Sequence, residues 1–229
     1  MRARGLELVV EADEERAAAR VAELLAEHAR QASEIVLTGG SSPGRAYQLA
    51  AELEPDWSRA GVWWGDERCV PPDDENSNFG LARRTLLDRL DSRPRVHRIR
   101  GEENPEAAAA AYEDQLRGTT LDFLLLGLGP DGHVASLFPN APALRERDRL
   151  VITAEPQLEP MIERITLTVP ALTSARTVVF LVTGEEKAEA VDRALAGPAA
   201  PSVPGSLVRS VHGRTLAILD EQAASRLHD

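Results

Sequence analysis

Short hydrophobic runs alternate along the chain with stretches of helical periodicity. The runs are rich in Val, Ile and Leu without strict alternation, which is typical of strands buried on both faces. They occupy residues 6–10, 34–38, 62–64, 121–127, 165–169, 177–183 and 215–219. Apolar residues recur at helical spacing in residues 12–32, 45–53, 78–90, 105–116 and 185–195. This repeated order of strand and helix predicts an α/β fold, with a mainly parallel sheet and helices on both faces.

Two segments fall outside this alternation. Residues 139–160 are rich in proline and charge and weak in periodicity, which indicates an excursion or a small subdomain, too short for an independent domain. Residues 198–205 carry three prolines and indicate a loop. Because the length suits a single α/β unit, we predict one domain over residues 1–229.

Composition and charge narrow the class of protein. Of the 229 residues, 43% are hydrophobic and 28% are charged, which excludes bulk disorder and a collagen-like repeat. Asp and Glu outnumber Lys and Arg by 37 to 26, which gives a net charge of −11. An acidic surface repels the phosphates of nucleic acids, so we expect no nucleic-acid partner.

The compartment is predicted from cysteine content and hydropathy. Cys69 is the only cysteine, so the chain can form no internal disulfide and no cysteine-based zinc site. Residues 1–15 are charged and lack the apolar core of a secretory signal. No apolar run approaches the ~20 residues of a membrane-spanning helix. We expect a cytoplasmic protein with no membrane partner and no metal site.

Lys187 is the only lysine among the 26 basic residues. A codon bias toward arginine would explain the excess of arginine. The remaining lysine then raises the question of whether its position requires an ammonium group.

Ligands of open α/β sheets bind where strands end and helices begin, and four such places carry candidate chemistry. The first is the loop of Gly39, Gly40, Ser41 and Ser42, followed by Pro43. Glycines admit a ligand close to backbone N–H groups, and the proline suits a first helical turn, so the helix start behind the loop is a candidate anion site. The alternative interpretation is a tight glycine turn with a serine cap.

The second place is the charged triplet of Asp66, Glu67 and Arg68, directly after the predicted strand 62–64. Three charged side chains directly after a buried strand cost free energy of folding unless they are solvent-exposed, form ion pairs or take part in function. Asp66 and Arg68 are two residues apart, so an extended chain directs them to the same side. This suits an acid–base pair, or an arginine that binds an anion while the aspartate orients it. The alternative is a solvated strand end with local ion pairs.

The third place is the glycine-rich segment after residue 126, which contains Asp131 and His133. Histidine is the side chain best suited to proton transfer near neutral pH. Asp131 would set the tautomer of His133 or bind a substrate hydroxyl. The remaining histidines lie at no such strand end and are expected to be exposed or incidental: His28, His97, His212 and His228.

The fourth place is Lys187, in the first turn of the helix predicted from Glu185. A cation at a helix N-terminus costs up to ~1 kcal/mol, which an anion drawn to the same dipole would offset. The alternative is a surface lysine beside Glu185 and Glu186.

Taken together, these segments resemble the 6-phosphogluconolactonase family over most of the chain. The motifs are T-G-G-S-S-P at 38–43, W-G-D-E-R-C-V-P-P at 64–72 with D-E-N-S-N at 74–78, G-L-G-P-D-G-H-V-A-S-L-F-P at 127–139, E-R-I-T-L-T-V-P-A-L at 163–172 and T-G-E-E-K-A at 183–188. Five motifs in this order are highly specific. One departure is Asn140, where family members often carry glycine.

The resemblance implies a Rossmann-like fold related to the glucosamine-6-phosphate deaminases. It also implies hydrolysis of 6-phospho-D-glucono-1,5-lactone in the oxidative pentose phosphate pathway, without an obligatory metal or organic cofactor. His133 falls on the family's general base, and Asp66 and Arg68 fall on its active-site D-E-R. Ser41, Ser42 and Lys187 fall near the substrate phosphate, and Arg164 is a further phosphate candidate.

These roles lead to a hypothesis for the site. The loop of Gly39, Gly40, Ser41 and Ser42 would hold the phosphate with Lys187. Arg68, or N–H groups after Gly129, would stabilise the oxyanion. The serines are poor nucleophile candidates, because no G-x-S-x-G elbow surrounds them. The chain is expected to act on a small-molecule sugar phosphate, as a monomer or a homodimer.

Two alternatives stay open. A glucosamine-6-phosphate deaminase shares the fold and the D-G-H turn, but typically has D-E-Y where this chain has D-E-R, and A-F-N-E-P where it has A-S-L-F-P. Release of ammonia from the amino sugar phosphate would identify it. A non-enzymatic sugar-phosphate sensor would bind ligand without hydrolysis, and no basic helix-turn-helix segment accompanies this chain.

Overall fold

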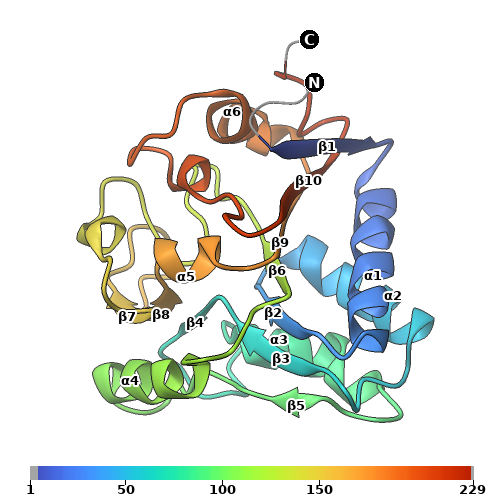
Figure 1. Cartoon of the computed structure of the whole chain (residues 1–229). Helices are drawn as coiled ribbons and strands as arrows, with labels where there is room; N and C mark the ends of the chain where they lie inside the picture. Colours follow the sequence, from blue (N-terminus) through green and yellow to red (C-terminus); the bar gives the residue numbers. More distant parts are fainter. Residues whose placement is uncertain (1–4, 228–229) are drawn as a thin grey trace.

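Six of the seven predicted hydrophobic runs, together with a short exposed strand over residues 95–96 that was not predicted, form a seven-stranded sheet in which every paired strand runs parallel to its neighbour. The computed structural model describes residues 5–227. The strands are β1 (Leu6–Glu11), β2 (Glu34–Leu37), β3 (Gly61–Trp64), β5 (Arg95–Val96), β6 (Phe123–Leu126), β9 (Thr177–Val182) and β10 (Arg214–Asp220), in the order β1-β10-β9-β6-β2-β3-β5. Figure 1 shows this sheet running through the middle of the molecule. The predicted α/β class with a mainly parallel sheet is confirmed.

Helices cover both sides of the sheet. They are α1 (Glu14–Arg30), α2 (Ser41–Leu53), α3 (Asn78–Thr85), α4 (Pro105–Leu116), α5 (Val169–Thr173) and α6 (Ala188–Val191). In Figure 1, α1 and α2 lie together on the right, and α4 and α5 lie on the left. The helix predicted over 185–195 is divided into a 3₁₀ turn (Glu185–Lys187), α6 and a π-helical turn (Asp192–Ala196). Further 3₁₀ turns span Leu87–Arg89, Pro142–Arg145 and Pro204–Leu207.

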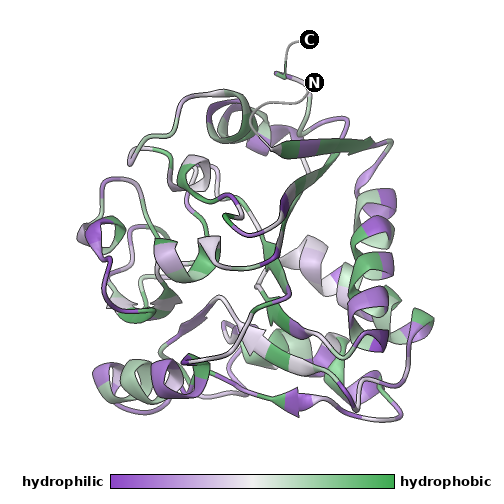
Figure 2. Cartoon of the chain, viewed as in Figure 1, coloured by the Kyte–Doolittle hydropathy of each residue, from purple (hydrophilic) through white to green (hydrophobic). Residues whose placement is uncertain are grey.

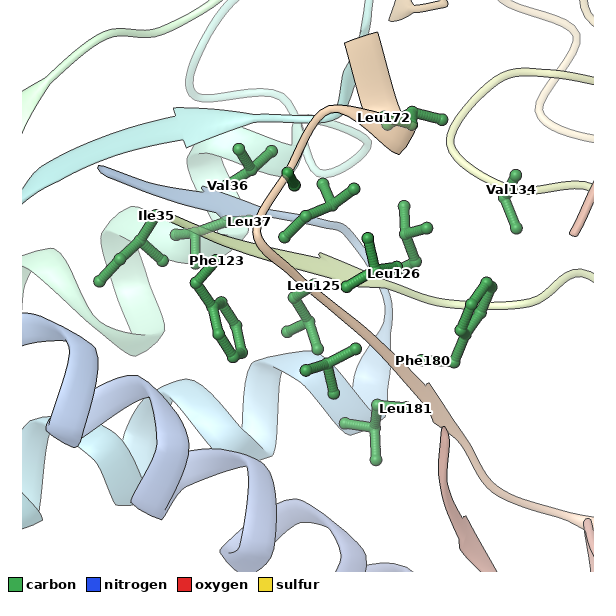
Figure 3. Packing of buried hydrophobic residues seen from close by; sticks show 14 of the residues in the cluster. Ile35, Val36, Leu37, Phe123, Leu125, Leu126, Val134, Leu172, Phe180 and Leu181 are labelled. Atoms are coloured by element: carbon green, nitrogen blue, oxygen red, sulfur yellow. The ribbon is translucent and has the colours of Figure 1, made fainter. Parts of the chain in front are cut away.

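The core lies on both faces of the central strands, as expected for strands without polar alternation. In Figure 3, Phe123, Leu125 and Leu181 face α1 and α2, whereas Val134 and Leu172 lie on the opposite side. All five side chains are buried. Figure 2 shows the consequence for the helices: α1 alternates hydrophilic and hydrophobic bands, while the central strands are largely hydrophobic.

A second, antiparallel sheet was not predicted. It consists of β4 (Asp66–Arg68), β8 (Arg164–Leu167) and β7 (Val151–Ala154), in the order β4-β8-β7. The run at 165–169 does contain a strand, but that strand belongs to this small sheet, which Figure 1 shows at the left. The charged segment β4 lacks the hydrophobic pattern by which strands are predicted, and its pairing partner β8 lies almost a hundred residues away in the sequence. The excursion at 139–160 supplies β7 and is thereby joined to the same sheet.

The strand order reverses between β2 and β6. From β2 the chain continues to β3 and β5 on one side, and it returns to β6 on the other side before adding β9 and β10. Such a reversal leaves a crevice at the carboxyl ends of the two strands, where ligands bind in open α/β sheets. The two loops that follow β2 and β6 are those singled out from the sequence.

The predicted domain span includes residues 1–4 and 228–229, which lie outside the described residues. The prediction for His228 falls there too. No helix within residues 5–227 is long and apolar enough to cross a membrane.

Candidate active site

A pocket of about 260 Å³ opens at the carboxyl ends of β2 and β6, and it gathers side chains from all four predicted strand ends. Nine of the ten candidate residues line it: Gly39, Gly40, Ser41, Ser42, Asp66, Arg68, His133, Arg164 and Lys187. The tenth, Asp131, is hydrogen-bonded to His133. The four segments singled out from the sequence therefore meet at one pocket.

The glycine-serine loop is fixed by the start of α2. Gly40, the residue before the helix, has φ 116°, a conformation that favours glycine. Tyr47, about two turns further along, accepts the Thr38 N–H (2.9 Å) and donates to the Thr38 carbonyl (2.6 Å). Ser41 and Ser42 therefore form the first turn, whose N–H groups have no acceptor within the helix. These N–H groups and hydroxyls are suited to an anion.

Ser42 already has two polar partners at the rim of the pocket. Its hydroxyl donates to Glu14 Oε1 at 2.8 Å, and its oxygen lies 2.8 Å from the Thr183 hydroxyl. Because the single hydroxyl hydrogen of Ser42 is directed to a carboxylate, it does not point to an anion in the pocket. Glu14 is the first residue of α1 and was not identified from the sequence.

The charged triplet forms the short extended strand β4, so the condition under which Asp66 and Arg68 point to the same side is met. Asp66 and Arg68 both face the pocket, and Glu67 points the other way. The Glu67 carboxylate accepts the backbone N–H groups of Asn78 (2.7 Å) and Phe79 (2.8 Å) at the start of α3. Burial raises the pKa of Glu67, although these hydrogen bonds oppose the shift. Glu67 therefore holds α3 against β4 and takes no part in the pocket.

Asp66 is buried and reaches Arg68 only through a third residue. Its two carboxylate oxygens accept from Asn78 Nδ2 (3.0 Å) and from the Ser136 hydroxyl (2.6 Å). Within residues 5–227 there is no direct ion pair between Asp66 and Arg68. The hydrogen bond to Ser136 connects β4 to the loop that carries His133.

Arg68 and Arg164 stand directly opposite each other in the antiparallel pair β4–β8. Arg164 is only 4% exposed, and its Nε and Nη2 donate to the carbonyls of Ile162 and Pro160, each at 3.0 Å. Burial lowers the pKa of Arg164, and the charge of Arg68 lowers it further. Like charges directly opposite in a sheet are unfavourable. Two cationic side chains side by side at a pocket are suited to an anion.

His133 is held by the tight turn that follows β6. The His133 carbonyl accepts the Gly129 N–H at 2.9 Å, and Gly132 has φ 89°. Asp131 Oδ1 lies 2.6 Å from Nδ1 of His133. Burial opposes ionisation of Asp131, but its hydrogen bonds with His133 prevail and lower its pKa. An ionised carboxylate only accepts hydrogen bonds, so Nδ1 of His133 carries the hydrogen of this contact and Nε2 is not engaged by Asp131.

Lys187 ends the 3₁₀ turn after β9 and lies half-buried at the pocket. Burial lowers its pKa, and the nearby carboxylates of Glu186 and Asp131 oppose that shift. In residues 5–227 Lys187 forms no ion pair. Its ammonium group is thus available to a ligand.

The other described histidines lie away from the pocket. His28 bonds to Ser33 (3.0 Å), His97 stacks on Trp63 with ring centroids 3.9 Å apart, and His212 is exposed. This agrees with the expectation that they are incidental. No group of three His, Cys, Asp or Glu residues within the described range is arranged to hold a metal ion.

Sequence reasoning missed the residues that support the site. Asn78 lines the pocket, and Ser136 and Glu14 bind site residues from distant parts of the chain. For Asn78, the signal was its place at the end of D-E-N-S-N. The arrangement combines a base held by a carboxylate with three cationic side chains. It is suited to proton transfer next to a bound anion.

Comparisons with known proteins agree on the family. A family model described as glucosamine-6-phosphate isomerases/6-phosphogluconolactonase matches residues 9–217. The chain is 40% identical to a 6-phosphogluconolactonase of Streptomyces coelicolor, over 98% of this chain and 92% of the relative. It is 39% identical to a human 6-phosphogluconolactonase, over 83% and 79% of the respective chains.

Solved structures agree as well. A 6-phosphogluconolactonase from Trypanosoma cruzi has a TM-score of 0.85 at 28% identity, over 97% of both chains. A monomeric glucosamine-6-phosphate deaminase has a TM-score of 0.83 at 22% identity, over 96% of this chain and 99% of its own, which shows a shared fold. The predicted relation to the deaminase fold is confirmed.

Proposed function

The chain belongs to the glucosamine-6-phosphate isomerase/6-phosphogluconolactonase family, and we propose that it hydrolyses 6-phospho-D-glucono-1,5-lactone to 6-phospho-D-gluconate, with His133 as the general base. Relatives that are about 40% identical over nearly the whole chain are 6-phosphogluconolactonases. The enzyme is then a lactone hydrolase of the oxidative pentose phosphate pathway.

The observation that carries the catalytic part of the proposal is the pairing of Asp131 with His133 at a pocket lined by cations. Hydrolysis of a lactone is accelerated by a base that takes a proton from water and by a positive group near the carbonyl oxygen. General-base help of this kind accelerates a reaction roughly 10²–10⁴-fold. The pairing holds Nδ1 of His133 and leaves Nε2 to act as the base, and Arg68 supplies the positive charge.

The reaction then proceeds in two steps. His133 Nε2 takes a proton from water as the water oxygen bonds to the lactone carbonyl carbon, and Arg68 stabilises the negative charge on the carbonyl oxygen. One well-placed donor to such an oxyanion contributes about 2.7–4 kcal/mol. The carbonyl re-forms, the bond to the ring oxygen breaks, and the His133 imidazolium returns its proton to that oxygen. The product is the open-chain acid.

The phosphate would be bound at the other end of the pocket. Lys187 and the N–H groups of Ser41 and Ser42 offer a charge and several donors there. Gly39 and Gly40 allow the phosphate to approach the backbone closely. Asp131 acts mainly through His133, and Arg164 adds positive charge beside Arg68.

We further propose that residues 1–229 act as one domain, as a monomer or homodimer, in the cytoplasm. The expected partner is the small sugar phosphate lactone. The net charge of −11 supports the absence of a nucleic-acid partner.

The function is tested by adding the purified protein to freshly generated 6-phosphogluconolactone and following acid release against the spontaneous rate. We expect fast hydrolysis by the wild type and a rate near the spontaneous one for His133→Ala. Near-normal turnover by His133→Ala would reject the general base. Release of ammonia from glucosamine 6-phosphate, without lactone hydrolysis, would instead identify a deaminase, and binding without turnover would identify a sensor.

A further inference from the structure

Asn78 occupies a position that no catalytic role assigned above explains. It is 2% exposed and opens α3, where its backbone N–H donates to Glu67 Oε1 at 2.7 Å. Ser77 caps the same helix by accepting the Gly80 N–H at 2.9 Å and donates to Glu67 at 3.0 Å. The backbone of Asn78 is thus held without its side chain. The side-chain amide is left to interact with the site.

The amide joins the two functional residues of β4. Its Nδ2 donates to Asp66 Oδ1 (3.0 Å) and to the Asp66 carbonyl (2.9 Å), and its Oδ1 accepts from Arg68 Nη1 (3.0 Å). A carboxylate only accepts hydrogen bonds and a guanidinium only donates them. The amide therefore has one possible orientation here. A side chain that only donates or only accepts could not bind both neighbours.

Arg68 depends on this contact for its position. Besides Asn78, the Nη1 group donates only to the carbonyl of Asn76 at 2.6 Å. Within the described residues, Nη2 donates to no acceptor, and Nε is buried without a partner. The Nη1 group of Arg68 is therefore fixed by the protein, and Nη2 and Nε are left to donate to a ligand.

Asn78 also touches the phosphate side of the pocket. A Cβ placed on Gly39 would lie 2.1 Å from Asn78 Oδ1, so the glycine loop packs directly against the amide. The same side chain thus meets the strand that carries Arg68 and the loop that precedes α2. Asn78 therefore lies between the Arg68 end and the glycine-loop end of the pocket.

We propose that Asn78 is a positioning residue that transmits the fixed position of Asp66 to the guanidinium of Arg68 during lactone hydrolysis. The inference rests on the proposed function, because it needs Arg68 to act on the substrate. Asp66 then serves as the buried anchor of Arg68 through the amide. It needs no direct ion pair with the arginine.

The test is a double-mutant cycle measured as kcat/KM for the phosphorylated lactone. We expect Asn78→Ala to lower kcat by about ten- to a hundredfold, as expected for a hydrogen bond to a charged group, with a smaller change in KM. In an Arg68→Ala background the same change should cost less than about twofold, because residues that act as a unit are not additive. An equal loss in both backgrounds would overturn the proposal.

Asn104→Ala is the matched control. Asn104 also stands at the start of a helix, where its side chain accepts the Ala107 N–H at 3.1 Å, but it does not line the pocket. We expect this variant to lower the melting temperature and leave kcat unchanged. A fall in kcat equal to that of Asn78→Ala would show that the effect is one of stability.

Asn78→Asp gives a second, independent measurement. It keeps the shape and the acceptor for Arg68, but places a carboxylate against Asp66. Two carboxylates that share a site raise the pKa of one of them, and the bound proton restores the missing donor. The activity of this variant relative to wild type should therefore rise as the pH falls from 8 to 6. A constant ratio would contradict the proposal.

The outcomes separate the inference from the proposed function. A wild-type protein that does not hydrolyse the lactone rejects the function. An active wild type with an additive cycle and a constant pH ratio rejects only the role of Asn78.

Discussion

Asp131 Oδ1 accepts two hydrogen bonds from the same residue, from the backbone N–H of His133 at 3.1 Å and from its Nδ1 at 2.6 Å. The carboxylate thus fixes both the backbone and the ring of His133. Because an ionised carboxylate has no hydrogen to donate, the ring hydrogen must lie on Nδ1. Nε2 is left as the acceptor that a general base requires.

Asp131→Asn should lower kcat by roughly a hundredfold or more, the lower range for loss of general-base help. The amide can donate to Nδ1 and so moves the ring hydrogen to Nε2. KM should change little, because Asp131 does not line the pocket. Since the pKa of Asp131 is lowered, the wild type should keep this carboxylate ionised over pH 5–8. A variant with normal kcat in that range would contradict the role of the pairing.

Gly129→Ala should inactivate the enzyme. A Cβ at this position would lie 2.0 Å from His133 Nδ1 and 2.7 Å from Asp131 Oδ1, so the pair would have to move. We expect kcat to fall by at least about a hundredfold, as in loss of the base. Gly65→Ala is the control, because its added Cβ would meet only Leu37 O at 3.7 Å and Val36 Cγ1 at 3.8 Å, and Gly65 does not line the pocket. Equal activity of the two variants would show that this packing does not position His133.

Lys187→Arg should raise KM for the phosphorylated lactone by about three- to tenfold. The planar guanidinium does not reproduce the geometry of the compact ammonium group, so part of the free energy of a hydrogen bond to a charged group is lost. Unphosphorylated glucono-1,5-lactone serves as the internal control, and its KM should not change. An unchanged KM for the phosphorylated substrate would reject contact between Lys187 and the phosphate. The test addresses the one position at which this arginine-rich chain keeps a lysine.

Glu14→Ala should lower KM for the phosphorylated lactone by about two- to tenfold, the worth of one hydrogen bond. The change frees the Ser42 hydroxyl, which now donates to Glu14, and removes a negative charge from the pocket rim. Glu15→Ala is the matched control, because Glu15 lies in the same turn but pairs with Arg45 at 2.6 Å. A KM that rises in Glu14→Ala would mean that the carboxylate orients Ser42 productively instead.

Cys69 should react slowly with iodoacetamide. Burial, aided by the charges of Glu163 and Glu67, raises the pKa of its thiol to about 11. The reactive thiolate is favoured only as the pH rises through that value, so the alkylation rate should still be climbing about tenfold per pH unit at pH 9. An ordinary thiol, with a pKa near 8.5, levels off there. A plateau near pH 9 for Cys69 would contradict the shift.

The sequence predicted the parts of the site that local spacing determines. Asp66 and Arg68 face the same side because a strand alternates its side chains, and the glycines around His133 marked a close approach. The partners of these residues were not predictable in this way. Ser136 reaches Asp66 across 70 residues, and β4 becomes a strand only because β8 pairs with it. Such contacts depend on tertiary packing and produce no periodic pattern of hydrophobic residues from which they could be predicted.

The cross-strand neighbours Arg68 and Arg164 have a consequence for the lifetime of the protein. Their mutual repulsion destabilises the small antiparallel sheet when the pocket is empty, and an anion between them removes that penalty. A ligand that binds only the folded chain at a hundred times its Kd adds about 2.7 kcal/mol of stability. Because the proposed site places the phosphate at Lys187 and the lactone carbonyl at Arg68, the anion that meets this arginine pair is the carboxylate of the product, and we expect the product to protect the folded chain against heat and proteolysis.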